Sequence, residues 1–276
     1  MGATSGIGLA VAQKLAAKGH KVGVAGRKVE VLKQLKEDFP DNIEWEEIDI
    51  TKKGAPERLK RLIDKLGGMD TYFHVSGVFY DNPELDLDQE MVTLETNAVG
   101  FARMTSTAYK YFRDTKRKGH IAAITSVAGT RGMGPIASYS STKKFGQTYL
   151  EALQQLAHLQ KLDIKFTDVR PGWIRTPLMS PDFEYPITME LSYAAPKILK
   201  SLSNCKTANY VDWRWELLIR LCQLIPRYLW VRFPFYVCWP STKQQIVENA
   251  AVENAEQIPE KQQTEAEKTA QSPQVK

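Results

Sequence analysis

Cysteine is scarce in this sequence, which has three in 276 residues: Cys205, Cys222 and Cys238. None of them forms a CxxC pair or belongs to a cluster with histidines. A disulfide framework needs paired cysteines at matched spacings, and a structural zinc site needs clustered Cys and His ligands. We therefore expect neither a disulfide framework nor a metal site, and we expect the protein to work in a reducing cytoplasm.

Long hydrophobic runs are absent as well. The sequence opens with small residues and glycines, not with the charged start and apolar segment of a signal peptide. In the apolar C-terminal part, the longest uncharged stretch is 233–242, which is too short to span a bilayer as a helix and contains two prolines. We expect no transmembrane segment.

A strong excess of charge of one sign is also missing. Lys and Arg number 37 and Asp and Glu 32, so the net charge is +5, too small for this length to indicate nucleic-acid binding. The hydrophobic share of 43% and the charged share of 25% are ordinary for a globular protein. The length favours one large domain or at most two.

What the sequence has is an alternation of short apolar runs with longer segments of helical periodicity. This pattern is typical of repeated βα units and predicts an α/β fold, a Rossmann-like, doubly wound parallel sheet. The expected strands are 21–25, 43–49, 69–75, 119–125 and 164–169. The expected helices are 7–17, 29–38, 56–66, 88–112 and 139–158.

The composition changes near residue 241. From there to residue 276 the chain is rich in Gln, Glu, Ala and Lys and has no aromatic residue. Such a segment cannot bury enough apolar surface to offset a backbone ordering cost of about 1–2 kcal/mol per residue. We expect one domain over 1–240, followed by a disordered polar tail over 241–276.

A glycine-rich turn leads into the first expected helix. Gly2, Gly6 and Gly8 allow a tight turn and a close backbone approach, with Ser5 and Ile7 between them. The helix N-terminus behind such a turn presents free N–H groups and the positive end of its dipole to a pyrophosphate. The turn therefore predicts a dinucleotide site, although a glycine-rich run alone is also compatible with an ordinary flexible segment.

Two basic residues follow the expected strand 21–25. In a Rossmann unit this position reads the adenosine ribose, and Arg27 and Lys28 suit a 2′-phosphate where an acidic residue would suit the two ribose hydroxyls. NADP(H) is therefore favoured over NAD(H). The alternative for Arg27 is a solvated charge at a strand end.

The strand that should precede the glycine turn has no sequence to form it, because the chain starts at the turn. Either the start is misassigned or the sequence is a fragment. We expect the natural protein to begin upstream of Met1.

Three side chains form the candidate catalytic group. Ser126 ends the expected strand 119–125, while Tyr139 and Lys143 lie four residues apart on one face of the next helix. A tyrosine that acts near pH 7 needs its pKa lowered by about three units, or roughly 4 kcal/mol. The Lys143 ammonium and an oxidised nicotinamide are the expected sources. Ser126 is expected to hold the substrate oxygen at the phenol while hydride moves.

In their order along the chain, these motifs resemble the short-chain dehydrogenase/reductase family, from Gly2 to about Leu202. The resemblance implies that Ser126, Tyr139 and Lys143 are the family's active-site residues. Asn97 would be the fourth, holding a proton-relay water against the lysine.

The same resemblance implies further cofactor contacts. Asp49 would contact the adenine, Gly77 would keep its place beside the cofactor, and Ile174 and Thr176 would meet the nicotinamide carboxamide and the phosphates. The family's Asn-Asn-Ala-Gly stretch reads His-Val-Ser-Gly at 74–77, and its usual leading Thr is Met1.

A second group repeats the catalytic spacings. Ser180, Tyr193 and Lys197 are separated by the same intervals as Ser126, Tyr139 and Lys143. Ser180 ends no expected strand, and Pro196 is expected to disrupt a helix between the other two. We do not expect this second group to be a site. Instead, about 178–202 is expected to form a substrate lid.

An apolar helix is expected at about 211–240. Its apolar positions at helical spacing are Leu217, Leu218, Leu221, Leu224, Ile225, Tyr228 and Leu229. It either packs on the core, lining the substrate pocket or a subunit contact in a homo-oligomer, or lies in a membrane interface with Trp and Arg beside the stripe.

The expected function is hydride transfer between NADP(H) and a carbonyl or secondary alcohol, with a lipid-like, steroid-like or long-chain substrate weakly favoured. The expected location is cytoplasmic, with contact to the inner face of a membrane left open. The alternative is a catalytically impaired nucleotide-binding or membrane-surface interaction protein.

Overall fold

The computed structural model describes residues 1–180, 183–233 and 239–240. Contacts divide the chain into one unit of Met1–Met179 with Pro186–Val237 and another of Ser180–Tyr185 with Cys238–Lys276. In the second unit, strands β6 (Phe183–Glu184) and β8 (Trp239–Pro240) pair antiparallel. The first unit carries the α/β fold. The tail predicted to be disordered, 241–276, lies outside the described residues.

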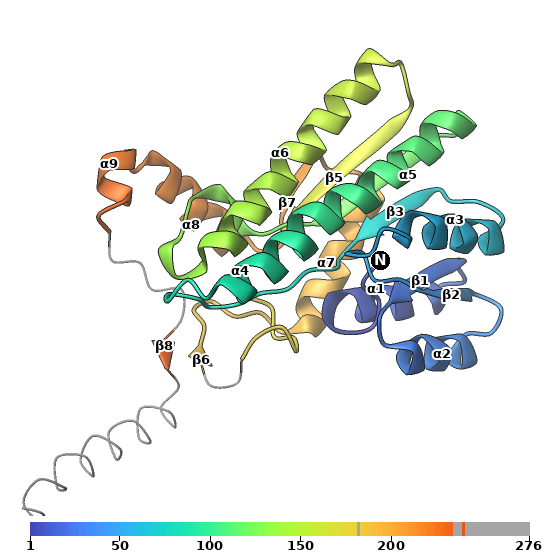
Figure 1. Cartoon of the computed structure of the whole chain (residues 1–276), viewed down its shortest axis with the longest axis horizontal. Helices are drawn as coiled ribbons and strands as arrows, with labels where there is room; N and C mark the ends of the chain where they lie inside the picture. Colours follow the sequence, from blue (N-terminus) through green and yellow to red (C-terminus); the bar gives the residue numbers. More distant parts are fainter. Residues whose placement is uncertain (181–182, 234–238, 241–276) are drawn as a thin grey trace, which may run out of the picture. The chain divides into compact units, whose positions relative to one another are not determined.

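The strands and helices expected up to residue 169 are present in the first unit with small changes at the ends, except that the helix expected at 88–112 is interrupted (Figure 1). Its strands are β1 (Val22–Gly26), β2 (Ile43–Glu47), β3 (Thr71–His74), β4 (Gly119–Ile124), β5 (Ile164–Arg170) and β7 (Ala208–Tyr210). Its helices are α1 (Gly6–Ala16), α2 (Val29–Asp38), α3 (Ala55–Leu66), α4 (Leu87–Leu94), α5 (Phe101–Thr115), α6 (Ala137–Leu159), α7 (Leu191–Asn204), α8 (Trp213–Leu224) and α9 (Arg227–Trp230).

The strands are all parallel and form two sheets, β1-β2 and β3-β4-β5-β7. Helices α3, α5 and α6 cover one face, while α1, α2 and α7 cover the other. Such two-sided covering is the doubly wound arrangement expected from the alternating pattern. The carboxyl ends of the strands therefore meet at one edge, where ligands bind in this kind of fold.

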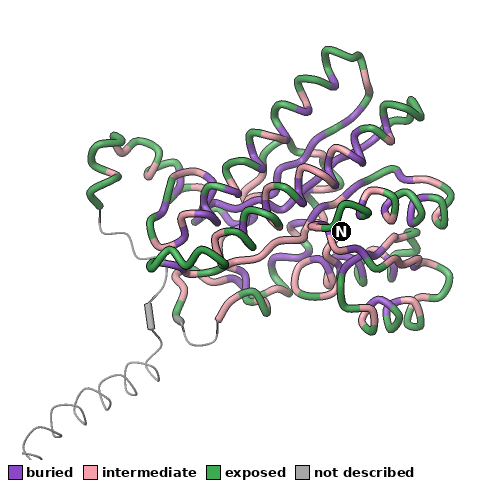
Figure 2. Tube along the Cα trace, in the orientation of Figure 1, coloured by how far each residue is buried: buried purple, intermediate pink, exposed green. Residues whose placement is uncertain are grey.

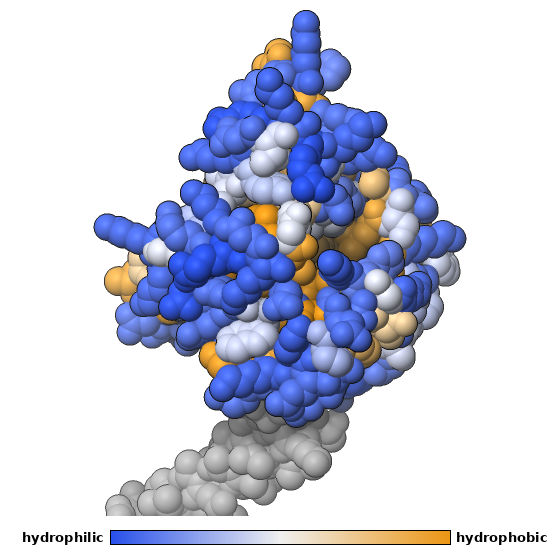
Figure 3. Space-filling model, turned by 90° about the vertical axis from the view of Figure 1, so that its right-hand side faces the viewer, coloured by the Kyte–Doolittle hydropathy of each residue, from blue (hydrophilic) through white to orange (hydrophobic). Residues whose placement is uncertain are grey.

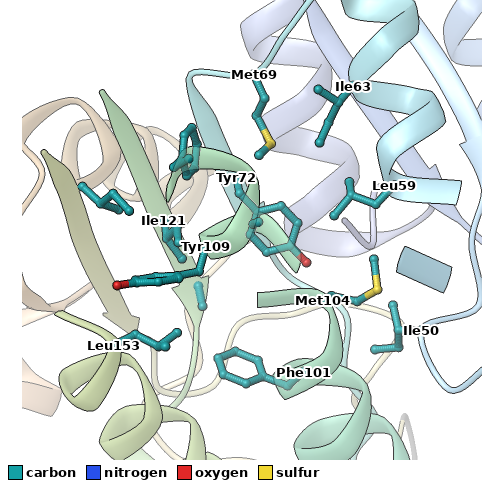
Figure 4. Packing of buried hydrophobic residues seen from close by; sticks show 14 of the residues in the cluster. Ile50, Leu59, Ile63, Met69, Tyr72, Phe101, Met104, Tyr109, Ile121 and Leu153 are labelled. Carbon is teal, nitrogen blue, oxygen red and sulfur yellow. The ribbon is translucent and has the colours of Figure 1, made fainter. Parts of the chain in front are cut away.

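The largest core cluster lies between the strands and α3, α5 and α6 (Figure 4). Met104 of α5 and Ile121 of β4 are fully buried in it. Phe112 packs over Gly119, where a Cβ would come within 2.5 Å of its ring. This packing fixes β4, the strand that leads directly to Ser126.

The first three residues lie between the two sheets. The Met1 amino group donates to Phe73 O at 2.9 Å, Val75 N donates to Met1 O at 2.9 Å, and Gly2 N donates to Ala25 O at 2.8 Å. No strand of the described residues lies between β1 and β3. The described strands therefore form two separate sheets, with Met1 and Gly2 bonded to a strand of each. In the view from the right of Figure 1, hydrophobic residues show in a hollow between hydrophilic surfaces (Figure 3).

Three expectations are corrected. The helix expected at 88–112 is interrupted by a π-helical turn at Glu95–Gly100 between α4 and α5. The prediction of a substrate lid at about 178–202 is wrong for α7, which makes up most of that range. This helix packs against α1 and the core, with Ala194, Ala195 and Ile198 fully buried. The prediction that Pro196 breaks a helix is also wrong, since α7 continues through it. A proline there costs about 3 kcal/mol, which this buried packing offsets.

The apolar helix expected at about 211–240 is two helices in the described residues. Helix α8 ends at Leu224, and Pro226 precedes the short α9. The residue before a proline is pushed out of the helical region, and Ile225 accordingly has ψ 123°. Residues 234–238 lie outside the described part. None of the described helices is both long enough and apolar enough to cross a membrane.

Candidate active site

A cavity of about 300 Å³ opens at the carboxyl ends of the strands in the first unit. Most residues predicted for the site line it. These are Gly2, Ser5, Gly6, Ile7, Arg27, Asp49, Gly77, Ser126, Tyr139, Lys143, Ile174 and Thr176. Gly8 and Asn97 lie outside this lining.

The glycine turn forms a narrow cradle at one end of the cavity. Gly2 has φ +86°, and a Cβ on it would lie 2.6 Å from Ser76 N. Gly6 has φ +50° and faces Thr176, whose side chain would lie 3.2 Å from such a Cβ. Gly8 is needed for packing, because its Cβ would lie 2.0 Å from Gly2 O. Larger residues would fill the space that this turn leaves.

Helix α1 begins directly behind the cradle. Its N-cap, Ser5, makes no side-chain capping bond, and the first turn has no acidic residue. The first N–H groups of α1 therefore keep their capacity to bind an anion, and the helix dipole favours one. The residues present fit a dinucleotide pyrophosphate at this end.

Two charged side chains line the cavity beyond the cradle. Arg27 follows β1 and is exposed to solvent. Asp49 follows β2 and accepts hydrogen bonds from Thr51 N at 3.0 Å and Thr51 Oγ1 at 2.8 Å. Burial raises the pKa of Asp49, but the two Thr51 bonds and the charges of Arg27 and Lys52 bring it below its ordinary value. Asp49 therefore stays ionised beside Arg27.

The other end of the cavity holds the candidate catalytic group. Ser126 follows β4, and its Oγ accepts from Ala128 N at 3.1 Å, which orients the hydroxyl. Tyr139 and Lys143 lie one turn apart near the start of α6, with Lys143 Nζ 5.4 Å from the centre of the Tyr139 ring. Lys143 Nζ also donates to Ile124 O at 3.3 Å. The three side chains thus come together as their spacing predicts.

Burial shifts the pKa values of this group. It raises the pKa of Tyr139 to about 12, and the Ser126 hydroxyl opposes the rise. It lowers the pKa of Lys143 to about 8, and the charge of Asp168 opposes the fall. The expected lowering of the Tyr139 pKa by Lys143 is therefore not found among the protein's own groups. A lower phenol pKa needs a further positive charge at this end of the cavity.

Asp168 is a buried carboxylate that no sequence motif predicted. It accepts from Thr125 Oγ1 at 2.5 Å and from Arg170 Nε at 2.6 Å, and it is 4% exposed. Burial raises its pKa, while Arg170, Thr125 and Lys143 oppose the rise. The signal in the sequence was an acidic residue beside Val169 and Arg170 at the carboxyl end of β5.

Asn97 lies in the π-helical turn, close to Lys143 but outside the cavity lining. Its Oδ1 accepts from Val78 N at 2.9 Å and its Nδ2 donates to Val78 O at 2.8 Å. A Cβ on Gly77 would lie 3.2 Å from Asn97 Oδ1 and 3.6 Å from Lys143 Nζ. Asn97 therefore fixes the segment that carries Gly77.

His74 occupies the first position of the stretch that departs from the family pattern. It is 1% exposed, and its Nδ1 lies 2.8 Å from Tyr72 Oη. Burial lowers its pKa to about 3, and the positive charge of Lys143 acts in the same direction. The imidazole is therefore neutral over the ordinary pH range.

The wall around Tyr139 is apolar and largely aromatic. Phe79 packs edge-on against Tyr139 at 4.9 Å and against Trp173 at 5.3 Å between ring centres. Helix α8 adds Trp215 and Leu218 to the lining. A Cβ on Gly172 would lie 2.1 Å from the Trp215 ring, so this glycine lets α8 reach the site. No sequence motif predicted that Phe79 and Trp173 would line the cavity. Lining of the pocket by the C-terminal apolar helix was one of the two alternatives that the sequence allowed.

Tyr193 and Lys197 also come together, on α7, where Lys197 Nζ donates to Tyr193 Oη. Neither is among the cavity-lining residues, and Tyr193 Oη donates to Asp212 at 2.9 Å. This pair was expected not to be a site. Tyr193 and Lys197 are not a site because α7 places them outside the cavity; Pro196 does not separate them, since the helix continues through it.

Comparison with known proteins decides the family. A sequence profile described as short chain dehydrogenase matches residues 1–185, more than half of the chain. The chain belongs to this family. Its members, the short-chain dehydrogenases/reductases, are oxidoreductases that bind a nicotinamide cofactor.

Among its relatives is an uncharacterized oxidoreductase of Myxococcus xanthus (strain DK1622), which is 29% identical over 232 residues, covering 82% of this chain and 90% of the relative. An uncharacterized oxidoreductase of Staphylococcus haemolyticus is 30% identical over 181 residues, covering 64% of this chain and 77% of the relative.

Solved structures of other short-chain dehydrogenases share the fold. A 3-ketoacyl-(acyl-carrier-protein) reductase from Brucella melitensis, complexed with NADH, has a TM-score of 0.67 and 20% identity, covering 76% of this chain and 94% of that one. A short-chain dehydrogenase/reductase from Burkholderia phymatum, in complex with NAD, has a TM-score of 0.70 and 15% identity, covering 80% and 90%. The Rossmann-like α/β fold of this chain is therefore that of the family.

Proposed function

We propose that this protein is an NADP(H)-dependent oxidoreductase that interconverts a carbonyl and a secondary alcohol on an apolar small molecule. One observation carries the proposal: Ser126, Tyr139 and Lys143 meet at one end of a cavity whose other end is the glycine cradle. A cofactor bound along this cavity supplies or accepts the hydride. The chain supplies binding, orientation and the proton.

The adenosine end of the cofactor is assigned to the residues after β1 and β2. Arg27 lines the cavity there and can make charge-assisted bonds to a 2′-phosphate, which favours NADP(H). Gly2, Ser5, Gly6, Ile7 and Gly8, with the start of α1, hold the pyrophosphate. Asp49 lies at the adenine, and Gly77, Ile174 and Thr176 lie along the nicotinamide half.

In reduction, the Tyr139 hydroxyl donates the proton to the substrate oxygen, and in oxidation it accepts the proton. Ser126 holds that oxygen at the phenol, so that the two oxygens stay within hydrogen-bonding distance. Because burial alone raises the pKa of Tyr139 to about 12, the phenol is a better donor than acceptor in the protein alone. In oxidation, the positive charge of an oxidised nicotinamide would favour the phenolate, which accepts the proton.

Asn97 acts in this proposal through position. Asn97 binds both backbone groups of Val78 and lies near Lys143. It therefore orders the segment beside Lys143, where a bound water can relay a proton to the lysine.

The substrate class follows from the wall around Tyr139. Phe79, Trp173, Trp215 and Leu218 offer an apolar surface, and a polar substrate would lose its hydration there without compensation. This favours a lipid-like, steroid-like or long-chain ketone or alcohol, taken up in the cytoplasm.

The deciding experiment is a screen that follows NADPH absorbance with ketones of increasing chain length. We expect kcat/KM to rise with apolar chain length and NADPH to be preferred over NADH. Absence of turnover with every ketone, together with no NADPH binding in a titration, would instead favour the alternative, a catalytically impaired membrane-surface interaction protein.

A further inference from the structure

Helix α8 is apolar on two opposite faces. Its inner face packs on the core through Trp215 and Ile219, which are 6% and 3% exposed. Its outer face carries Leu217 and Leu221, which are 51% and 54% exposed. A helix that is apolar on both sides is normally covered on both sides. In the part of the chain that the structure describes, nothing covers the outer face.

The exposed face is larger than these two leucines. We call it the outer stripe, defined by the apolar residues of α8, α9 and the three residues after them that are at least 48% exposed: Trp213, Leu217, Leu221, Leu224, Tyr228, Leu229, Val231 and Phe233. Figures 1 and 2 place α8 and α9 on the outside of the unit, with α9 mostly exposed. Contiguous apolar surface of this kind marks an interaction site.

The stripe is held in a fixed place. Arg131 donates from one guanidinium nitrogen to the carbonyl oxygens of Cys222 at 3.2 Å, Gln223 at 2.8 Å and Ile225 at 2.6 Å, at the end of α8. Trp230 Nε1 donates to Gly132 O at 2.8 Å, and Arg131 lies 5.6 Å from the Trp230 ring centre. These bonds tie the break between α8 and α9 to the segment that precedes Tyr139.

Positive charge accompanies the stripe. Arg214 pairs with Asp212 at 2.9 Å and Arg220 with Glu216 at 2.7 Å. Among the described residues, no acidic side chain forms an ion pair with Arg227 or Arg232, at the α9 end. The stripe thus combines exposed Trp, Tyr, Phe and Leu with uncompensated arginines. Helices that lie in the interface of an anionic bilayer have this combination.

The same helix forms part of the cavity wall. Leu218 lines the cavity and is itself 37% exposed, between the inner face and the outer stripe. Leu178, which also lines the cavity, is exposed as well. Leu218 therefore belongs both to the wall of the cavity and to the exposed surface of α8.

We propose that the outer stripe docks this protein on an anionic lipid surface, so that the apolar substrate enters the cavity from the lipid past Leu218. Docking itself stands apart from the proposed catalysis, whereas substrate entry from lipid rests on the proposed function. Helix α8 has 12 residues and is about 18 Å long, so it lies along the surface and does not cross it.

The first test is co-sedimentation of the full chain with vesicles of phosphatidylglycerol and phosphatidylcholine. Leu217→Ser with Leu221→Ser should lower the partition constant about tenfold or more, because two side chains lose their burial in the acyl region. A matched control is Leu156→Ser with Leu159→Ser, which changes two exposed leucines of α6. This control should bind as the unchanged protein does.

The second test separates charge from apolar contact. Arg227→Gln with Arg232→Gln should weaken binding to the anionic vesicles about tenfold or more and change binding to pure phosphatidylcholine little. NADPH oxidation with a short water-soluble ketone should stay unchanged in all these variants. With a long-chain ketone presented in anionic vesicles, the rate of NADPH oxidation should fall in both the double leucine variant and the double arginine variant.

Three outcomes would overturn the proposal: no vesicle binding by the unchanged chain, an equal loss in the α6 control, or a lipid-free dimer that Leu217→Ser with Leu221→Ser converts to monomer in sedimentation equilibrium. The last would make the stripe a contact between two copies. Vesicle binding without turnover of any ketone would support the docking surface while removing the proposed catalysis.

Discussion

Lys143 Nζ lies 5.4 Å from the centre of the Tyr139 ring, and burial moves the pKa values of these two neighbours apart: it raises that of Tyr139 to about 12 and lowers that of Lys143 to about 8. A change of charge on one therefore affects the other at close range. This relationship makes Tyr139 the first residue to test.

Replacing Tyr139 by Phe should abolish most turnover and spare cofactor binding. The ring and its contact with Phe79 remain, and only the hydroxyl that moves the proton is lost. We expect kcat to fall by a factor on the order of 10²–10⁴, with the NADPH dissociation constant within a few-fold of the original. Tyr193→Phe is the matched control and should leave kcat unchanged. Equal losses in both variants would contradict the assignment.

Replacing Arg27 by Asp should reverse the cofactor preference from NADPH to NADH. The carboxylate repels the 2′-phosphate and can accept hydrogen bonds from the ribose hydroxyls. The measurement is kcat/KM for both cofactors. Lys21→Asp makes the same charge change just before β1, at an exposed residue outside the cavity lining, and should keep the preference. If Arg27→Asp still prefers NADPH, another residue reads the phosphate.

Local patterns in the sequence predict the strands and helices up to residue 169, because each was bounded by its own periodicity and turn residues. Tyr139 and Lys143 are predictable for a similar reason, since four residues along one helix place them on one face. Phe79 and Asp168 were missed because their roles depend on contacts between segments far apart in the chain.

The C-terminal helices show the other limit of sequence reasoning. The stripe of leucines was compatible with packing on the core or with a membrane interface; in the structure Trp215 and Ile219 form the buried face, and Leu217 and Leu221 are exposed. A helix with two apolar faces does not reveal from its sequence which one meets the core. Similarly, Pro196 predicted a break in α7 that buried neighbours prevent.

Acid should destabilise the fold through buried His74. Its pKa is about 3 in the folded protein and near 6.5 when the chain unfolds, so the unfolded state binds more protons between these values. The free energy of unfolding should therefore be highest above pH 6.5 and fall by about 1.4 kcal/mol per pH unit as the pH drops toward 3. Burial lowers the pKa of His120 to about 4, which adds to the fall in the same direction.

The measurement is the free energy of unfolding in urea at about pH 4.5 to 7.5. This range covers the pH values just below the pKa of His74 in the unfolded chain, where the loss of stability begins. His74→Asn should reduce the pH slope, because an amide does not titrate there. Gln13→Asn, at an exposed position with no titrating group, should leave the slope as it was. An unchanged slope in His74→Asn would mean that other groups cause the acid sensitivity.

Asp168 should act as a positioning residue for the charge of Lys143. Its carboxylate raises the pKa of Lys143 against the effect of burial, which brings that pKa down to about 8. Asp168→Asn keeps the shape: its one amide oxygen can accept from Arg170 Nε and its amide nitrogen can donate to Thr125 Oγ1, but the negative charge is removed. Lys143 should then lose its proton at a lower pH, so the alkaline limb of the kcat/KM profile should move to lower pH. Asp163→Asn, at an exposed ion pair with Lys118, should leave the profile in place. A purely structural role for Asp168 would lower the rate at every pH without moving the limb, and that result would contradict an electrostatic role.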